Sequence, residues 1–217
     1  MKEGIPNLYT LMRQDIIEGN LQAGLKLKPS ELKSHYDVSI NTLREALTRL
    51  SSDGFVESED QKGFRVASIS LKNLEDLKQM RVLLEIEGIK QSIANNSVEW
   101  EAGIVAAHYK LTQIENAMEV DEKANFKLWC QYDYEFHRAL MGACNNKLII
   151  DMHKTVFDQF RRYFLINNKV NGFDKKQISG DHKKLCDLVL KKETELCIKV
   201  LNQHINVITE NNRSVLS

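Results

Sequence analysis

The chain has 217 residues, of which 42% are hydrophobic, so it is long enough to form two domains with separate cores. The 30 Lys and Arg residues balance 30 Asp and Glu residues, which excludes the broad basic surface of a nonspecific nucleic-acid-binding protein. The sequence lacks an N-terminal signal peptide and any run of about 18 apolar residues, so we expect a soluble, cytoplasmic protein with no membrane partner.

The cysteine pattern points to a reducing compartment. The four cysteines lie in helix-like sequence and none are two residues apart, unlike the spacing of a disulfide framework or a zinc ribbon. We therefore expect four reduced thiols, most of them buried, at Cys130, Cys144, Cys186 and Cys197.

Two helices are predicted at the N-terminus. Apolar residues at helical spacing indicate a first helix from about 5 to 18, which ends at Gly19 and Asn20. Pro29 and Ser30 then begin a short second helix, since proline is favoured at the first helical position.

A third helix follows, with Ser39 as its N-cap and Gly54 at its end. Its apolar positions repeat at intervals of 3, 4 and 7, which leaves other faces of the helix polar. The apolar positions are Leu43, Ala46, Leu47 and Leu50, and the polar ones include Asn41, Thr42, Arg44 and Arg49.

A hairpin is predicted next. Phe55 and Val56 form one strand, residues 57–63 make the polar turn, and residues 64–67 return. Lys62 and Gly63 at the tip are able to approach a phosphate closely. Two helices, a turn, a third helix and a hairpin follow the order of a winged helix-turn-helix, so we assign residues 1–69 to a DNA-binding domain.

Beyond residue 69 the chain has no proline and almost unbroken helical periodicity, with Ser70 as the first N-cap. We therefore expect a mainly α protein, in which a C-terminal all-α six-helix bundle over residues 70–217 follows a winged helix-turn-helix with a small β-hairpin wing. The helices are predicted at 71–94, 98–119, 122–143, 146–168, 175–191 and 194–211.

Four side chains of this bundle have the spacing of a metal site. Asp133 and His137 are four positions apart, so both project from one face of a helix. His182 and His204 are 22 positions apart, but the turn predicted near residue 192 lies almost midway, and an antiparallel hairpin brings them to the same height. Three imidazoles and a carboxylate suit a divalent transition metal, zinc by default. Hydrogen-bonded core histidines are the alternative.

Arginines beside inward faces have two interpretations. Arg81 lies beside the apolar positions of MRVLLE, where it either pairs with Glu85 or receives an anion. Arg161 and Arg162 raise the same question, and a run of bases on a long helix is usually solvated. His35, His108 and His153 have no partner of the metal-site kind, so structural roles suit them better.

These motifs together resemble the GntR family of bacterial transcription regulators, in its FadR branch with a C-terminal ligand-sensing FCD domain of the shorter, VanR-like form. The N-terminal resemblance rests on residues 15–39, LREALTRLSSDGFV and QKGFRVA. The C-terminal resemblance rests on MRVLLE, YDYEFHRAL, NNKLI and the pair His182 and His204. It covers nearly the whole chain, and the two motif sets occur in the expected order.

For the N-terminal domain the resemblance implies that Arg44 and Arg49 contact operator DNA and that the wing tip at Gly63 enters the minor groove. The family commonly has an arginine where this chain has Ile40. Asn41 or Thr42 is therefore expected to contact a different base or only phosphate, which changes the expected operator sequence.

For the C-terminal domain the resemblance implies that Asp133, His137, His182 and His204 are metal ligands. Arg81 matches an arginine that meets the carboxylate of the effector, and Asn146 matches a position near the pocket. The implied effector is a small organic acid that binds beside or directly to the metal.

Three functions are consistent with these features. The first is a homodimeric repressor of two-fold operator DNA, controlled by an organic acid and coupled through the helix that begins near Ser70. The second is a metal-dependent enzyme acting on an organic acid, although no nucleophile and base are suitably spaced. The third is a regulator in which the metal only braces the bundle.

Overall fold

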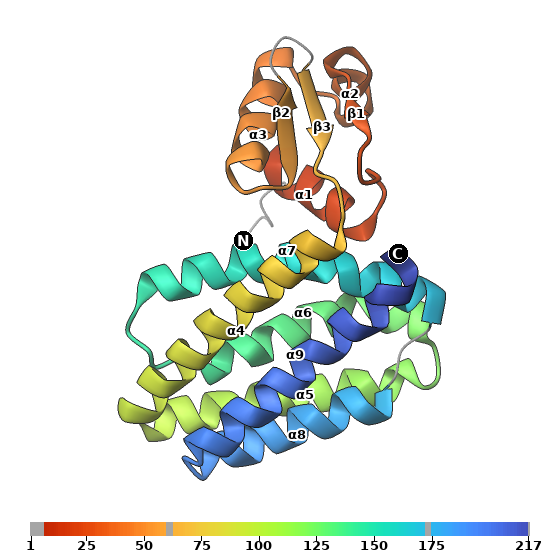
Figure 1. Ribbon diagram of the computed structural model, residues 1–217. Coiled ribbons are helices and arrows are strands. Elements are labelled where there is room, and N and C mark those ends of the chain that lie inside the picture. Colours follow the sequence, from red (N-terminus) through yellow and green to blue (C-terminus); the bar gives the residue numbers. More distant parts are fainter. Residues whose placement is uncertain (1–6, 60–62, 172–174, 217) are drawn as a thin grey trace.

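The computed structural model describes residues 7–59, 63–171 and 175–216. A small N-terminal head of three helices and a sheet lies on one side of a bundle of long helices (Figure 1). The head and the bundle have separate hydrophobic core clusters. Among the described residues, no helix is long and apolar enough to cross a membrane.

The three helices of the head are α1 (Leu8–Glu18), α2 (Pro29–Tyr36) and α3 (Ile40–Ser52). The side chain of Ser39 accepts a hydrogen bond from the Thr42 backbone N–H at 3.1 Å, so the predicted N-cap of α3 is confirmed. Gly19 ends α1 in the left-handed region at φ 78°, where glycine has no Cβ penalty. The predicted apolar positions of α3 are all buried.

The sheet of the head has the strand order β1 (Lys26–Leu27), β3 (Gly63–Val66), β2 (Val56–Glu59), with antiparallel neighbours. The predicted turn began too early, because Glu57 to Glu59 continue the strand. Glu57 pairs with Arg65 across the ladder, and opposite charges at facing positions favour strand pairing. The short strand β1 was not predicted, since two residues carry no periodic pattern.

The bundle consists of α4 (Leu71–Ala94), α5 (Val98–Met118), α6 (Glu122–Leu140), α7 (Lys147–Asn171), α8 (Lys175–Leu190) and α9 (Thr194–Leu216). Ser70, Ser97 and Asp121 cap the first three of these helices with side-chain oxygens. The predicted mainly α fold is therefore confirmed. The main differences are that α6 ends three residues early and that α7 and α9 run further than predicted.

The core of the bundle lies between long helices that cross one another. Helix α4 packs on α7 and α9, and α5 packs on α6 and α8. Gly88 in α4 is required for close packing, because a Cβ there would lie 2.7 Å from the side chain of Met141. The four cysteines are free and buried, as predicted.

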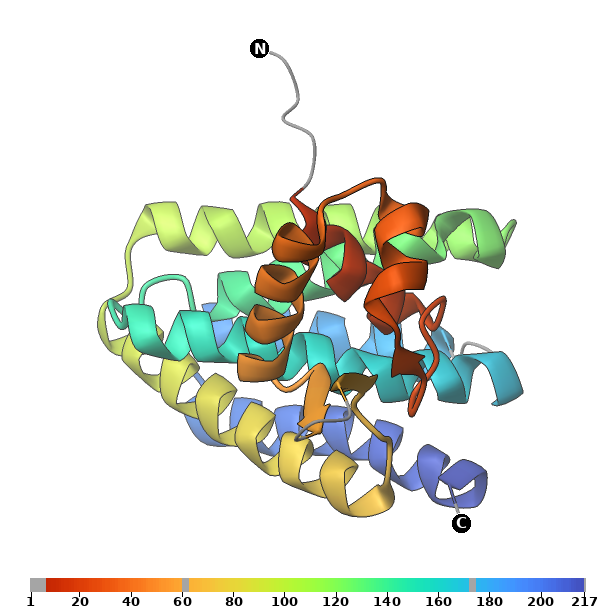
Figure 2. The same ribbon diagram turned by 90° about the horizontal axis from the view of Figure 1, so that it is seen from above.

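Helix α7 lies on the side of the bundle nearest the head, and the head sits across it when viewed from above (Figure 2). Of the alternatives that the sequence left open for Arg161 and Arg162, the solvated one does not hold. Arg162 is buried and donates to the Ala67 carbonyl at 2.6 Å, and Arg161 donates to the Cys130 carbonyl at 3.2 Å. Sequence spacing did not reveal this, because the acceptors belong to distant segments that pack on α7.

Candidate functional site

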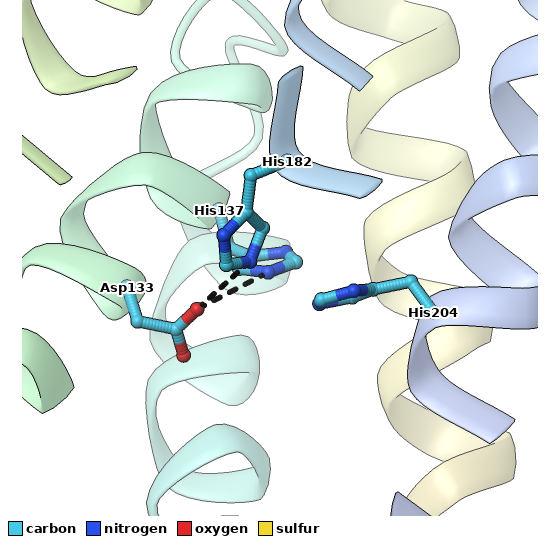
Figure 3. A group of neighbouring side chains, drawn as sticks. All are labelled: Asp133, His137, His182 and His204. Carbon is cyan, nitrogen blue, oxygen red and sulfur yellow. Dashed lines mark ion pairs between the residues drawn. The ribbon is translucent and has the colours of Figure 1, made fainter. Parts of the chain in front are cut away.

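Four side chains from three helices meet inside the bundle (Figure 3). Asp133 and His137 lie one turn apart on α6, while His182 comes from α8 and His204 from α9. Lys192, at φ 60°, lies in the tight turn that reverses the chain between α8 and α9. One ligand atom from each of the four residues lies within 4.8 Å of the others, and all four residues are buried. The structure thus brings together the group that sequence spacing predicts.

Two of the imidazoles are held by carboxylates on their outer side. His137 Nδ1 lies 2.7 Å from Glu85 Oε2, and His182 Nδ1 lies 2.8 Å from Glu115 Oε1. If Nδ1 carries the hydrogen and donates it to the carboxylate, Nε2 keeps a lone pair. Such carboxylate–histidine pairs fix the ring orientation and make the inner nitrogen a better metal ligand.

The Nε2 atoms of His137 and His182, which face the centre of the group, have the surroundings expected of metal ligands. Nε2 of His137 is buried and has no hydrogen-bond partner, and Nε2 of His182 is buried with the Asp133 carboxylate as its neighbour. Asp133 Oδ1 lies 3.7 Å from the first nitrogen and 3.2 Å from the second. Lone pairs and a carboxylate oxygen at these distances repel one another unless a proton or a cation lies between them. The donor set therefore fits a bound cation.

The protonation of the three histidines differs. Burial opposes a charge on His182, but Asp133 and Glu115 outweigh it and raise its pKa to about 9. Burial, with repulsion from His182 and His137, lowers the pKa of His204 to about 4. Burial also lowers the pKa of His137. At neutral pH two imidazoles are thus neutral, as ligation requires, and His182 holds a proton that a cation must displace.

Glu85 links several residues around this group. Its side chain is fully buried and accepts from Arg81 Nε at 2.7 Å, and it lies 2.7 Å from His137 Nδ1 and 3.0 Å from His153 Nε2. Burial alone would raise its pKa, but His137 and Arg81 hold that pKa well below its usual range. Glu85 is therefore a buried carboxylate with at least one permanent positive partner.

Arg81 takes the first of the two roles that the sequence left open, pairing with Glu85, and keeps one donor without a partner. Its Nε pairs with Glu85, while its Nη2 is buried and has no hydrogen-bond partner. The guanidinium carbon lies 4.2 Å above the centre of the Phe157 ring, which holds the planar group in place. Asn146, which the resemblance places near the pocket, accepts from the Ile149 backbone N–H at 3.2 Å and caps the start of α7.

Three residues of the site were missed from the sequence. Glu115, Asp181 and His153 belong to helices α5, α8 and α7. Asp181 directly precedes His182, but adjacent positions on a helix do not face the same way, and no spacing links Glu115 or His153 to the four predicted ligands. The Asp181 carboxylate lies 3.7 Å from His204 Nδ1, beyond hydrogen-bond distance. For His153 the sequence indicated a structural role, which its hydrogen bond to Glu85 fits.

The predicted DNA-contacting residues of α3 are at the surface of the head. Asn41, Thr42, Arg44 and Arg49 are all exposed, and the Arg49 guanidinium lies 4.0 Å above the Tyr9 ring. Gly63 has φ +94° and open space where a Cβ would stand, so backbone at this position can approach another molecule closely. Lys62 lies outside the described residues.

Comparison with known proteins gives two family matches. Residues 6–66 match the family described as bacterial regulatory proteins, gntR family, and residues 76–207 match the FCD domain. Together these two matches span the head and nearly all of the bundle.

Relatives along the whole chain agree. The chain is 34% identical to the uncharacterized HTH-type transcriptional regulator BphR of Paraburkholderia xenovorans, over 91% of this chain and 80% of that protein. It is 32% identical to the HTH-type transcriptional repressor GlaR of Escherichia coli, over 91% of this chain and 90% of that protein.

A solved structure shares the fold. The crystal structure of a GntR regulator from Rhodococcus covers 94% of both chains with a TM-score of 0.73 at 20% identity. The matching families and relatives are transcriptional regulators and not enzymes. This chain therefore belongs to the GntR family of bacterial regulatory proteins, with an FCD domain, and is a transcriptional regulator.

Proposed function

We propose that this regulator is a homodimeric repressor of two-fold operator DNA, and that a small organic acid bound at a metal ion in the bundle controls its affinity for DNA. The observation that carries the sensing half is the convergence of four buried ligand atoms within 4.8 Å of one another, among them His137 Nε2, which has no hydrogen-bond partner. Native proteins rarely leave such atoms unsatisfied without a functional reason.

The metal would be held by Asp133, His137, His182 and His204. Three imidazoles and one carboxylate suit a divalent transition metal, and zinc is the default for this set. Such an ion, when bound, would supply a positive centre for the carboxylate of an acid. Arg81 supports the same chemistry, because its unpartnered Nη2 is a buried donor on the residue whose Nε shares Glu85 with His137.

The DNA-binding half rests on α3 and the wing. Arg44 and Arg49 are exposed on the predicted recognition helix, where an arginine is able to donate two hydrogen bonds to guanine. Asn41 and Thr42, at the N-terminal end of α3, would contact base or phosphate, and Gly63 with Lys62 would follow the minor groove.

Dimerisation and repression have separate support. Helix-turn-helix proteins usually bind DNA as two-fold dimers. The bundle also leaves large apolar side chains exposed, including Leu83, Leu148 and Tyr109, as a subunit interface would need. Repression is proposed because GlaR, a relative of similar length, is named a repressor.

Selection of binding sites from random duplex DNA, followed by titration of the selected site, tests the DNA-binding half. We expect Arg44→Ala to weaken operator binding by about 5- to 150-fold, the range for a lost bidentate base contact. Arg138→Ala is the matched control, because Arg138 is an exposed arginine on α6 in the bundle. Unchanged affinity in Arg44→Ala would overturn the assignment of α3.

The sensing half is tested with zinc-loaded and chelator-treated protein and a panel of small mono- and dicarboxylic acids. We expect at least one acid to change operator affinity only in the zinc-loaded form. If chelation unfolds the bundle and no acid changes DNA binding, the metal has a structural role and the sensing proposal fails.

A further inference from the structure

The route from the candidate metal site to the DNA-binding surface begins at Glu85. This buried carboxylate contacts the ligand His137 through Oε2 and contacts His153 of α7 through Oε1, at 2.7 and 3.0 Å. Arg81, which also binds Oε1, lies over the rings of Phe157 and Phe160 on the same helix, at 4.2 and 5.1 Å. One segment of α7 is thus packed against the residues that hold the metal ligands.

The next turns of α7 contact the head. The buried carboxylate of Asp158 forms an ion pair with Arg13 of α1. Gln159 donates to the Asp53 carbonyl at 2.7 Å. Gly54, at φ +74°, lets this contact form, because a Cβ there would lie 2.9 Å from the Gln159 amide nitrogen.

From Asp53 the contacts continue to the predicted recognition helix. Tyr9 donates its hydroxyl hydrogen to the Asp53 carboxylate at 2.5 Å, and the guanidinium of Arg49 lies 4.0 Å above the Tyr9 ring. A shift of α7 relative to α1 would therefore act on an arginine that is proposed to contact DNA.

The linker between head and bundle is also held by α7. Arg162 donates to the Ala67 carbonyl at 2.6 Å, while the Tyr163 hydroxyl accepts from the Ser70 backbone N–H at 3.1 Å and donates to Asn73 at 2.7 Å. The sequence suggested coupling through the helix that begins near Ser70. In the structure, the start of that helix is itself positioned by α7.

We propose that α7 couples the candidate metal site to the DNA-binding head. His153 contacts the residues around the metal site, and Asp158 and Gln159 contact the head. This inference rests on the proposed function, because it needs a cation at the four ligands. With a cation held at its Nε2, His137 would donate a stronger Nδ1–H bond to Glu85, and this would change how that carboxylate holds His153. A rigid helix carries the change over the five residues to Asp158, a rise of about 7.5 Å.

Hydrogen exchange with zinc alone as the ligand tests this coupling in the full-length protein. In the wild type we expect saturating zinc to slow exchange by at least about fivefold in peptides from both residues 147–156 of α7 and residues 8–18 of α1. In Asp158→Asn the slowing should persist in α7 and disappear from α1.

Two further variants accompany Asp158→Asn, one that breaks the same ion pair from the other side and one that serves as a control. Arg13→Gln breaks the same ion pair from the head side and should repeat the result if Asp158→Asn fails to fold. Asp151→Asn is the matched control, because Asp151 is an exposed acid on α7 that pairs with Lys147 of the same helix. It should behave as the wild type.

The outcomes separate the two proposals. If calorimetry detects no zinc binding, the proposed metal site and the coupling both fail. If zinc binds but leaves exchange in α1 of the wild type unchanged, only the coupling fails. The same holds if the slowing in α1 survives in both Asp158→Asn and Arg13→Gln.

Discussion

The head and the candidate metal site are built in opposite ways. The candidate DNA contacts Asn41, Arg44 and Arg49 come from one helix and stand exposed at its surface. The candidate ligands come from three helices, are buried, and depend on further residues from α4 and α5 to orient them. A contiguous surface site tolerates exchange of single residues, whereas a buried site fails as a unit, since each group depends on its neighbours.

The largest effect is expected at Glu85. Glu85→Gln removes the negative charge that compensates buried Arg81, and breaking a buried pair costs about 3–5 kcal/mol of the free energy of unfolding. Urea unfolding monitored by circular dichroism measures this loss. Glu87→Gln is the control, because Glu87 is exposed on the same helix. Equal stability in both variants would mean that Glu85 does not organise the site.

The second effect is on metal affinity. His204→Ala removes one of four ligands, and we expect zinc affinity to fall by more than about 100-fold, since even orienting residues are worth 10- to 100-fold. Competition with a chromophoric chelator gives the affinity. His108→Ala is the matched control, because His108 is a half-buried histidine outside the four ligands. If the two variants bind zinc equally, His204 is not a ligand.

The third effect is the change of zinc affinity with pH. The pKa of His182 is raised to about 9, so below that pH zinc must displace its proton, whereas His204, with its pKa lowered to about 4, is already neutral. Zinc affinity should therefore rise about tenfold per pH unit between pH 7 and 8.5. Calorimetry at pH 7.5 in buffers of different ionisation enthalpy should show release of about one proton per zinc.

The raised pKa of His182 also predicts how the stability of the metal-free protein changes with pH. Because the folded pKa of His182 lies above its ordinary value of 6.5, its protonation contributes stability that is fully present below pH 6.5. That contribution is lost as the pH rises through about 9. A metal-free protein whose stability increases over this interval would contradict the assignment of the His182 proton.

The smallest effect is expected in the head. Ser39→Ala removes the N-cap of α3 and should cost about 1 kcal/mol of the stability of the head. Ser52→Ala is the control at the other end of the helix, where the hydroxyl only donates to the Thr48 carbonyl. Hydrogen exchange in α3, measured as the temperature is raised, compares the stability of the head in Ser39→Ala and Ser52→Ala. An equal loss of stability in both variants would mean that Ser39 does not stabilise the head as an N-cap.

Local sequence patterns were enough to predict the helices and to group the four candidate ligands. Helical periodicity and capping residues depend on neighbours within about four positions, so α3 and its cap at Ser39 were predictable. Asp133 with His137, and the hairpin that pairs His182 with His204, also follow from local spacing and a single turn.

The contacts that connect these parts were not predictable from local patterns. Glu115 beside His182, His153 beside Glu85, and Asp158 beside Arg13 each join helices far apart in the sequence. The burial of Arg162 has the same origin. Spacing along one chain carries no information about which distant segment packs on a given helix face, because that choice is made by complementary packing of whole helices.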